Sequence, residues 1–243
     1  MSKISFVTAA AAIMATVVLS EPTKAQSSEA WNACVGGRGE PAFLQISGCS
    51  LVIQSGKATA AQITFAYGRV CVAQIYRGYP TSATEYCDEA IAREPRGALH
   101  WFSRGHAFLM REDYQHAISD FDEALRLDQQ NPWAYSDRCF AQLPAGDGQR
   151  ALTDCNEALR LKPNNATVLA VRGFANLRLD NFDAAIADFD AALRLQGNLA
   201  HALYGRGLAK LKKGDDQGSS DISAAKDIST WIVKFYSRAG FTE

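Results

Sequence analysis

The sequence predicts an all-α protein built as a solenoid of stacked helical hairpins. Three observations predict it: a period of 34 residues, apolar residues at helical spacing within each unit, and polar or Pro/Gly turns at the expected helix ends. A fixed period of this size is typical of repeated supersecondary units, each of which buries a face against its neighbours. The units begin at Thr64, Ala98, Pro132, Ala166 and Ala200.

The first 25 residues differ in composition from the rest of the chain. Lys3 precedes an apolar run from Ile4 to Leu19, and small residues surround Ala25. This pattern is typical of a secretory signal peptide, so we expect cleavage after Ala25. An uncleaved anchor is the alternative, although the run is short for a membrane span. After cleavage we expect no stable membrane insertion, and the predicted location is periplasmic or secreted.

Residues 26–63 are predicted to form an atypical first hairpin, since Pro41 suits the first turn of a helix and apolar residues follow at helical spacing. Each of the five units that follow is predicted to hold two helices joined by a polar turn. Their ranges are 64–97, 98–131, 132–165, 166–199 and 200–233. A last helix within residues 229–243 carries Trp231 and Phe235 and is predicted to cap the final hairpin, because a terminal repeat would otherwise face water.

The six cysteines are expected to form disulfides, because an exported chain folds in an oxidising compartment. Two units carry Cys at both their eighth and twenty-fourth places, whereas two others carry Gly with Phe at these places. Places that change together are expected to face each other across a hairpin. The predicted pairs are Cys34–Cys49, Cys71–Cys87 and Cys139–Cys155. Each should add about 3 kcal/mol to stability by the chain-entropy relation. Buried free thiols in a cytosolic protein are the alternative.

The units that begin at Ala98, Pro132 and Ala166 resemble the tetratricopeptide repeat. They carry second helices of the form I-x-D-F-D-x-A-L-R-L or close to it, and an Arg-Gly pair recurs in the first helix. This combination of second-helix pattern and Arg-Gly pair resembles that of exported repeat proteins of alphaproteobacteria. The resemblance implies a right-handed superhelix whose first helices line a concave face. It also implies a protein that binds other proteins and performs no chemistry.

Arginine recurs at the seventh place of four units and aspartate at the twenty-third place of three. The hairpin geometry brings these places together, so we predict the ion pairs Arg104–Asp120, Arg138–Asp154 and Arg172–Asp188. A half-buried pair of this kind fixes register more than it adds stability. The alternative is an arginine ladder for an acidic or phosphate ligand. Arg206 faces Ile222 in this register and is predicted to be the freest of the four.

The resemblance places the second, fifth, ninth and twelfth residues of each first helix on the concave face. The groove predicted to bind a peptide is formed by Phe102, His106, Trp133, Phe140, Phe174, Tyr204 and Leu208. Many of these side chains could instead pack helix on helix, and the leucines at the twelfth place are expected in the core. Trp133, Phe140 and Phe174 are expected to be exposed. An apolar groove favours an amphipathic helix or an extended apolar peptide. The Lys, Asn and Arg clamp of co-chaperones in this family is absent.

Other function classes receive little support from the sequence. The formal charge of −1 gives no basic field for nucleic acid. The four histidines are not spaced for zinc, and Ser223-Ala224-Ala225-Lys226 lacks the partner motifs of an S-x-x-K enzyme. We therefore expect no cofactor, no metal and no catalysis. A self-associating structural component and an enzyme of unknown reaction are the alternatives to a protein-binding scaffold, and the partner stays unidentified.

Overall fold

The computed structural model describes residues 24–36 and 42–242, and these residues form α-helices and turns without a strand. The predicted signal segment lies almost wholly outside the described residues, as does the expected helix start at Pro41. None of the described helices is long and apolar enough to cross a bilayer.

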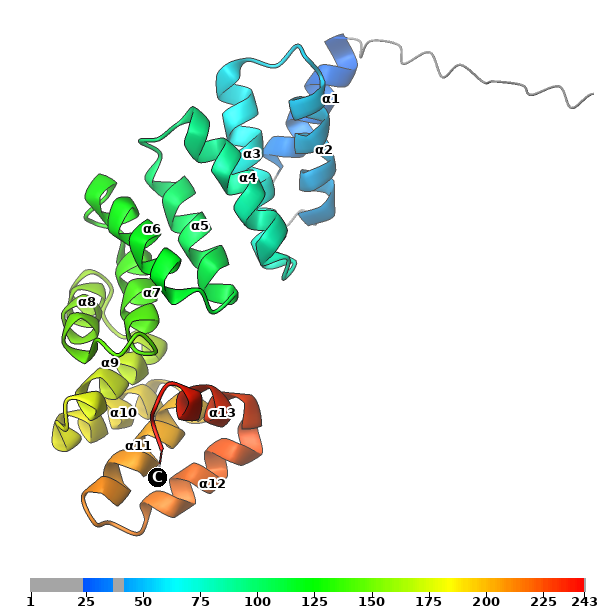
Figure 1. The fold of residues 1–243 in the computed structure, drawn as a ribbon. Coiled ribbons are helices and arrows are strands. Elements are labelled where there is room, and N and C mark those ends of the chain that lie inside the picture. Colours follow the sequence, from blue (N-terminus) through cyan, green and yellow to red (C-terminus); the bar gives the residue numbers. More distant parts are fainter. Residues whose placement is uncertain (1–23, 37–41, 243) are drawn as a thin grey trace, which may run out of the picture.

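The helices follow one another as antiparallel pairs (Figure 1). The first pair, ahead of the repeats, is α1 (Lys24–Val35) and α2 (Ala42–Gln54). The five units are formed by α3 (Ala60–Tyr76) with α4 (Pro80–Arg93), α5 (Ala98–Met110) with α6 (Tyr114–Leu127), α7 (Pro132–Gln142) with α8 (Gly148–Leu161), α9 (Ala166–Arg178) with α10 (Phe182–Leu195), and α11 (Ala200–Lys212) with α12 (Gly218–Ile228). The last helix is α13 (Thr230–Arg238).

The turn inside each unit places its fifteenth residue in the left-handed region of the backbone map. Glycine takes this position in three units, at Gly78, Gly146 and Gly214, with φ of 77°, 87° and 82°. Glu112 and Asp180 adopt the same conformation, each with φ of 58°. Glycine adopts this conformation without steric cost, and its periodic use sets the sharp return of the second helix.

The side chains at the eighth and twenty-fourth places meet in the first four units, and a disulfide closes the hairpin ahead of them. The structure joins the cysteines as predicted, in Cys34–Cys49, Cys71–Cys87 and Cys139–Cys155. In two of the three units that lack the disulfide, a phenylalanine ring packs on a glycine, and a Cβ added at Gly105 would lie 2.8 Å from Phe121. In the fifth unit, Gly207 lies against Ile222 and Gly218 instead. A disulfide and a Gly–Phe contact are therefore two ways to fill the same space between paired helices.

The hairpins stack along a curve, and the first helix of each unit lies on its inner side. Consecutive first helices contact one another, from α3 and α5 through to α9 and α11. This inner side is the concave face of the molecule.

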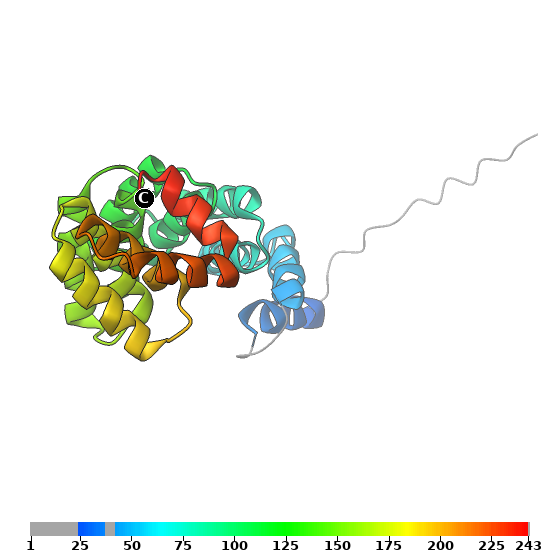
Figure 2. The same cartoon turned by 90° about the horizontal axis from the view of Figure 1, so that it is seen from below.

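Helix α13 contacts both helices of the final hairpin, α11 and α12, but it also covers part of the concave face, which the sequence does not predict. It turns back inside the curve (Figure 1) and, seen from below, runs across the body of the stack (Figure 2). Ser229 connects α12 to α13 and is the N-cap of α13, where its side chain accepts a hydrogen bond from the backbone N–H of Ile232. The apolar face of α13 is thereby directed at the concave face.

Candidate functional site

The N-terminal part of the concave face presents one large apolar side chain from each of three successive units. These are Phe65, Leu99 and Trp133, each at the second place of its unit, and they are 40%, 61% and 49% exposed. The Asn131 side chain caps α7 by accepting hydrogen bonds from the backbone N–H groups of Trp133 and Ala134. This cap holds Trp133 in the first turn, and Lys162 Nζ lies 3.7 Å from its ring centroid.

Two further residues form the floor between these side chains. Phe102 is half-buried against Phe121, with ring centroids 6.0 Å apart. His106 Nδ1 lies 2.8 Å from Asp137 Oδ2, across the junction of two units. The hydrogen bond to Asp137 raises the pKa of His106, although burial opposes the shift. We call the inner face of α3, α5 and α7 that carries Phe65, Leu99, Phe102, His106 and Trp133 the open half.

The C-terminal part of the concave face is covered by α13. The Phe235 ring stacks on Phe140 of α7 with centroids 5.3 Å apart, and the Tyr236 ring stacks on Phe174 of α9 at 3.7 Å. His201 Nδ1 lies 3.2 Å from the Tyr236 hydroxyl. We call the inner face of α7, α9 and α11 beneath α13 the covered half, and Phe140 lies at its border with the open half.

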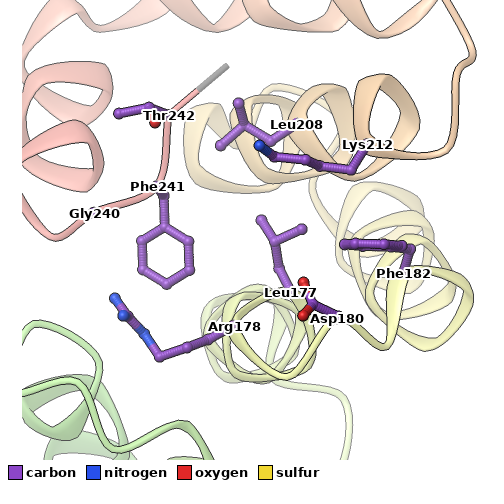
Figure 3. A pocket seen from close by; sticks show the side chains of 9 residues that line it. All are labelled: Leu177, Arg178, Asp180, Phe182, Leu208, Lys212, Gly240, Phe241 and Thr242. Carbon is purple, nitrogen blue, oxygen red and sulfur yellow. The ribbon is translucent and has the colours of Figure 1, made fainter.

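The segment after α13 is seated in the same face. The Tyr204 hydroxyl donates a hydrogen bond to the Phe241 carbonyl at 2.9 Å, and Arg178 donates one to the Ala239 carbonyl. Phe241 points between Leu177 and Arg178, whose guanidinium carbon lies 4.4 Å from the ring centroid (Figure 3). A shallow pocket remains beside the tail, and burial lowers the pKa of Arg178 at its edge. Its lining residues are Leu177, Arg178, Asp180, Phe182, Leu208, Lys212, Gly240, Phe241 and Thr242.

This arrangement corrects the predicted groove. Phe174, expected to be exposed, is fully buried, and Tyr204 and Leu208 are 2% and 1% exposed. The cause is α13 and its tail, which occupy the space that a ligand would need. Phe140 is half-buried under Phe235, whereas Trp133 is exposed and Phe102 and His106 are half-buried without cover from α13. The leucines at the twelfth place divide: Leu143 and Leu177 are buried, and Leu109 and Leu211 are half-buried.

The arginines at the seventh place lie where the sequence places them. Arg104 donates hydrogen bonds to both carboxylate oxygens of Asp120 at 2.8 and 2.7 Å, and Arg138 does the same to Asp154 at 2.7 and 2.6 Å. Arg172 donates to Asp188 at 2.5 and 3.0 Å. The hydrogen bond to Asp120 raises the pKa of Arg104 further, against the opposing effect of burial.

Each arginine also has a second partner that the sequence analysis missed, on the second helix of the preceding unit. These partners are Asp88, Asp122, Asn156 and Asp190, at 2.6, 2.6, 3.0 and 2.8 Å from Arg104, Arg138, Arg172 and Arg206. The signal was present in the sequence, because every one of them occupies the twenty-fifth place of its unit.

The expectation that Arg206 is the freest arginine is wrong. Its Nε and Nη2 atoms donate to both oxygens of Asp221 at 2.8 and 2.7 Å. Asp221 precedes Ile222, so the fifth unit has moved its aspartate by one residue rather than lost it. Burial alone would raise the pKa of Asp221, but the hydrogen bonds from Arg206 and Lys210 hold it below its ordinary value. The ladder therefore carries no unpaired arginine among the four.

The comparisons with known proteins agree with this geometry. The family model described as Tetratricopeptide repeat matches residues 72–132 and 172–219. YrrB, titled as a TPR protein with an unusual peptide-binding site, aligns with a TM-score of 0.62 at 18% identity, over 79% of this chain and 98% of its own. MamA from Desulfovibrio magneticus RS-1 aligns with a TM-score of 0.61 at 19% identity, over 68% of this chain and 94% of its own. The chain matches no curated protein sequence.

The chain has the fold of tetratricopeptide-repeat proteins, and its described residues form five units of two helices with a helical pair ahead of them. Tetratricopeptide-repeat proteins are in general non-catalytic interaction modules. The three disulfides suggest an oxidising environment outside the cytoplasm.

Proposed function

We propose that this protein is a non-catalytic scaffold of the periplasm or the extracellular space, and that it binds a peptide or helix of a partner protein on the open half. The observation that carries the proposal is the alignment of Phe65, Leu99 and Trp133 on three adjoining helices. Single exposed apolar residues are common on protein surfaces, but their recurrence at the same place of three adjoining helices supports an interaction site.

Rigidity of the scaffold supports the same proposal. The disulfides Cys71–Cys87 and Cys139–Cys155 lock two of the three hairpins that form the open half. A surface that is already in its bound shape loses little conformational entropy when the ligand docks. The apolar run ahead of Ala25 and the disulfides together support export of the chain.

Site-specific photo-crosslinking in the native host tests this function. A photoreactive residue in place of Leu99 or Trp133 should trap the same partner. Leu195 is the matched control, because it is 50% exposed on α10, a second helix outside the concave face. Trapping of one species from Leu99 and Trp133 but not from Leu195 supports the proposal. The same species from all three positions, or none from the open half, contradicts it.

Self-association is a second candidate, favoured by the outer end of the stack. Helix α2 exposes Phe43, Leu44 and Leu51, which are 61%, 43% and 56% exposed. A pair of these faces would bury them against each other. Light scattering on the purified chain tests this candidate: a dimer that dissociates in the Leu51→Asp variant supports it, and a monomer at high concentration contradicts it.

A further inference from the structure

The covered half holds a helix in the way that a helix-binding groove holds its ligand. Helix α13 buries Ile232, Phe235 and Tyr236, and directs Lys234 and Arg238 to solvent. Its rings are seated on Phe140 and Phe174, the ninth-place residues of two successive units. Buried Ile232 and Tyr236 are spaced i and i+4, and anchors at this spacing are the usual mode by which an amphipathic helix enters a groove. The concave face therefore binds an amphipathic helix with aromatic residues within the protein itself.

The open half adjoins this surface through α7, which belongs to both halves. The stack of Phe235 on Phe140 lies at the border, and the ninth place of the preceding unit is His106, whose ring centroid is 6.4 Å from that of Phe102. Leu99 and Trp133 add exposed apolar surface from the second places, where the covered half has Thr167 and His201. The same helix faces are therefore used on both sides of the border.

Trp231 is the part of α13 that remains available. It lies one turn before Phe235 on the same side of the helix, and their ring centroids are 5.5 Å apart. Phe235 in turn contacts Phe140 of α7, so this side of α13 is directed towards the units of the open half. Trp231 is nonetheless 59% exposed. A large aromatic ring held in place by stacking, but uncovered, is suited to anchor a partner at low entropic cost.

We propose that the open half binds an amphipathic helix of a partner that carries aromatic residues at the spacing found in α13, namely i, i+4 and i+5, and that Trp231 forms one end of this site. This inference rests on the proposed function and adds the class of ligand and the participation of α13. The C-terminal helix then has two roles: it fills the covered half and supplies an aromatic wall to the open half.

The probe is a labelled synthetic peptide of residues 229–242 of this chain, which has the required spacing. A second peptide of the same composition, with the aromatic residues moved out of register, is the control. Fluorescence anisotropy with the full-length protein should show saturable binding of the first peptide. The second should bind at least about tenfold more weakly, a difference of about 1.4 kcal/mol.

Three variants locate the bound peptide. Leu99→Asp and Trp231→Ala should each weaken binding about tenfold, and Leu195→Asp should leave it unchanged; a tenfold change corresponds to about 1.4 kcal/mol. Trp231→Ala removes an exposed ring, so the far-ultraviolet spectrum and melting curve should match those of the wild type. Photo-crosslinks from the labelled peptide should fall on α5 and α7.

The outcomes separate this inference from the proposed function. If Leu99→Asp weakens binding but the register of the aromatic residues and Trp231 have no effect, the open half binds peptides and the inference is wrong. Crosslinks to α9 and α11 would mean that the peptide displaces the protein's own α13 from the covered half, which also overturns it. Absence of saturable binding of the α13 peptide also overturns the inference. The proposed function is tested separately, by the crosslinking from Leu99 in cells.

Discussion

Arg104, Arg138 and Arg206 each hold two carboxylates that belong to different hairpins. Arg138, for example, lies on α7 and contacts Asp154 on α8 as well as Asp122 on α6. The pair inside the hairpin is buried, with Asp154 only 5% exposed, whereas the pair to the preceding hairpin is open to solvent on the Asp122 side. One side chain therefore closes its own hairpin and fixes the angle to the neighbour.

The sequence predicts the partner inside the hairpin for Arg104, Arg138 and Arg172, and it shows a recurring twenty-fifth-place residue without showing which arginine that residue reaches. The partner inside the hairpin requires only that two places of one hairpin face each other. The second partner depends on how one hairpin rotates against the next, which the packing of whole helices determines. In the fifth unit the aspartate lies one residue before the twenty-third place, at Asp221. The fixed 34-residue alignment therefore did not identify Asp221 as the partner of Arg206.

Removal of Arg138 should cost far more than removal of its exposed partner. Arg138→Ala leaves Asp154 charged and buried, with Gln142 as its remaining hydrogen-bond donor at 2.9 Å, so the free energy of unfolding should fall by about 3–5 kcal/mol. Asp122→Asn weakens only the exposed contact and should cost less than about 1 kcal/mol. Urea unfolding measures both. The double variant Arg138→Leu with Asp154→Leu should recover most of the loss; equal losses for Arg138→Ala and Asp122→Asn would contradict this account.

At the scale of the helical pair, the 34-residue register was sufficient to predict the repeat hairpins and the pairs Cys71–Cys87 and Cys139–Cys155, and the similar separation of Cys34 and Cys49 predicted the third pair. The reason is physical: a hairpin with a turn of fixed length brings the eighth and twenty-fourth places opposite each other whatever residues occupy them. In two of the units that lack cysteine, a phenylalanine ring packed on glycine fills the space between the paired helices, as Phe189 does. A Cβ added at Gly173 on α9 would lie 2.6 Å from this ring, and one added at Gly205 on α11 would lie 2.2 Å from it. The ring is held between two glycines.

Gly173→Ala should therefore destabilise the protein, although Gly→Ala within a helix normally stabilises by up to about 1 kcal/mol. Phe189 cannot retreat, because Gly205 bounds its other side, so the added methyl should cost about 1–3 kcal/mol in overpacking. Urea denaturation measures the change. Repetition in a Phe189→Leu background is the control, where the smaller side chain should remove most of the effect. An unchanged or raised stability of Gly173→Ala in the wild-type background would rule out the tight contact.

For the whole molecule, the sequence predicts the stack of helices but not how its last helix is used. Trp231, Ile232, Phe235 and Tyr236 form an apolar side that suits either the end of the last hairpin or the concave face. The pattern in the sequence does not distinguish these two surfaces, because both are apolar. The concave face offers rings at Phe140 and Phe174 for stacking, and this contact divides the predicted groove into an open and a covered half.

Docking of α13 should weaken in acid because of His201. Burial lowers the pKa of His201 in the folded protein, and its Nδ1 atom faces the buried hydroxyl of Tyr236. The unfolded chain therefore takes up a proton first as pH falls. The stabilising contribution of neutral His201 is complete above the unfolded-state pKa of about 6.5 and is lost as pH falls from there through the lower folded-state pKa.

His106 is the internal contrast, because the hydrogen bond to Asp137 raises its pKa. Its contribution is complete below about pH 6.5 and is lost as pH rises through the raised folded-state value. Urea unfolding between pH 5 and 8.5 should show His201→Gln with a smaller loss of stability on the acid side than the wild type. His106→Gln should show a smaller loss on the alkaline side. Hydrogen exchange, corrected for its intrinsic pH dependence, should place the acid-side loss in α13. Loss of protection in α5 instead would show that α13 stays docked in acid.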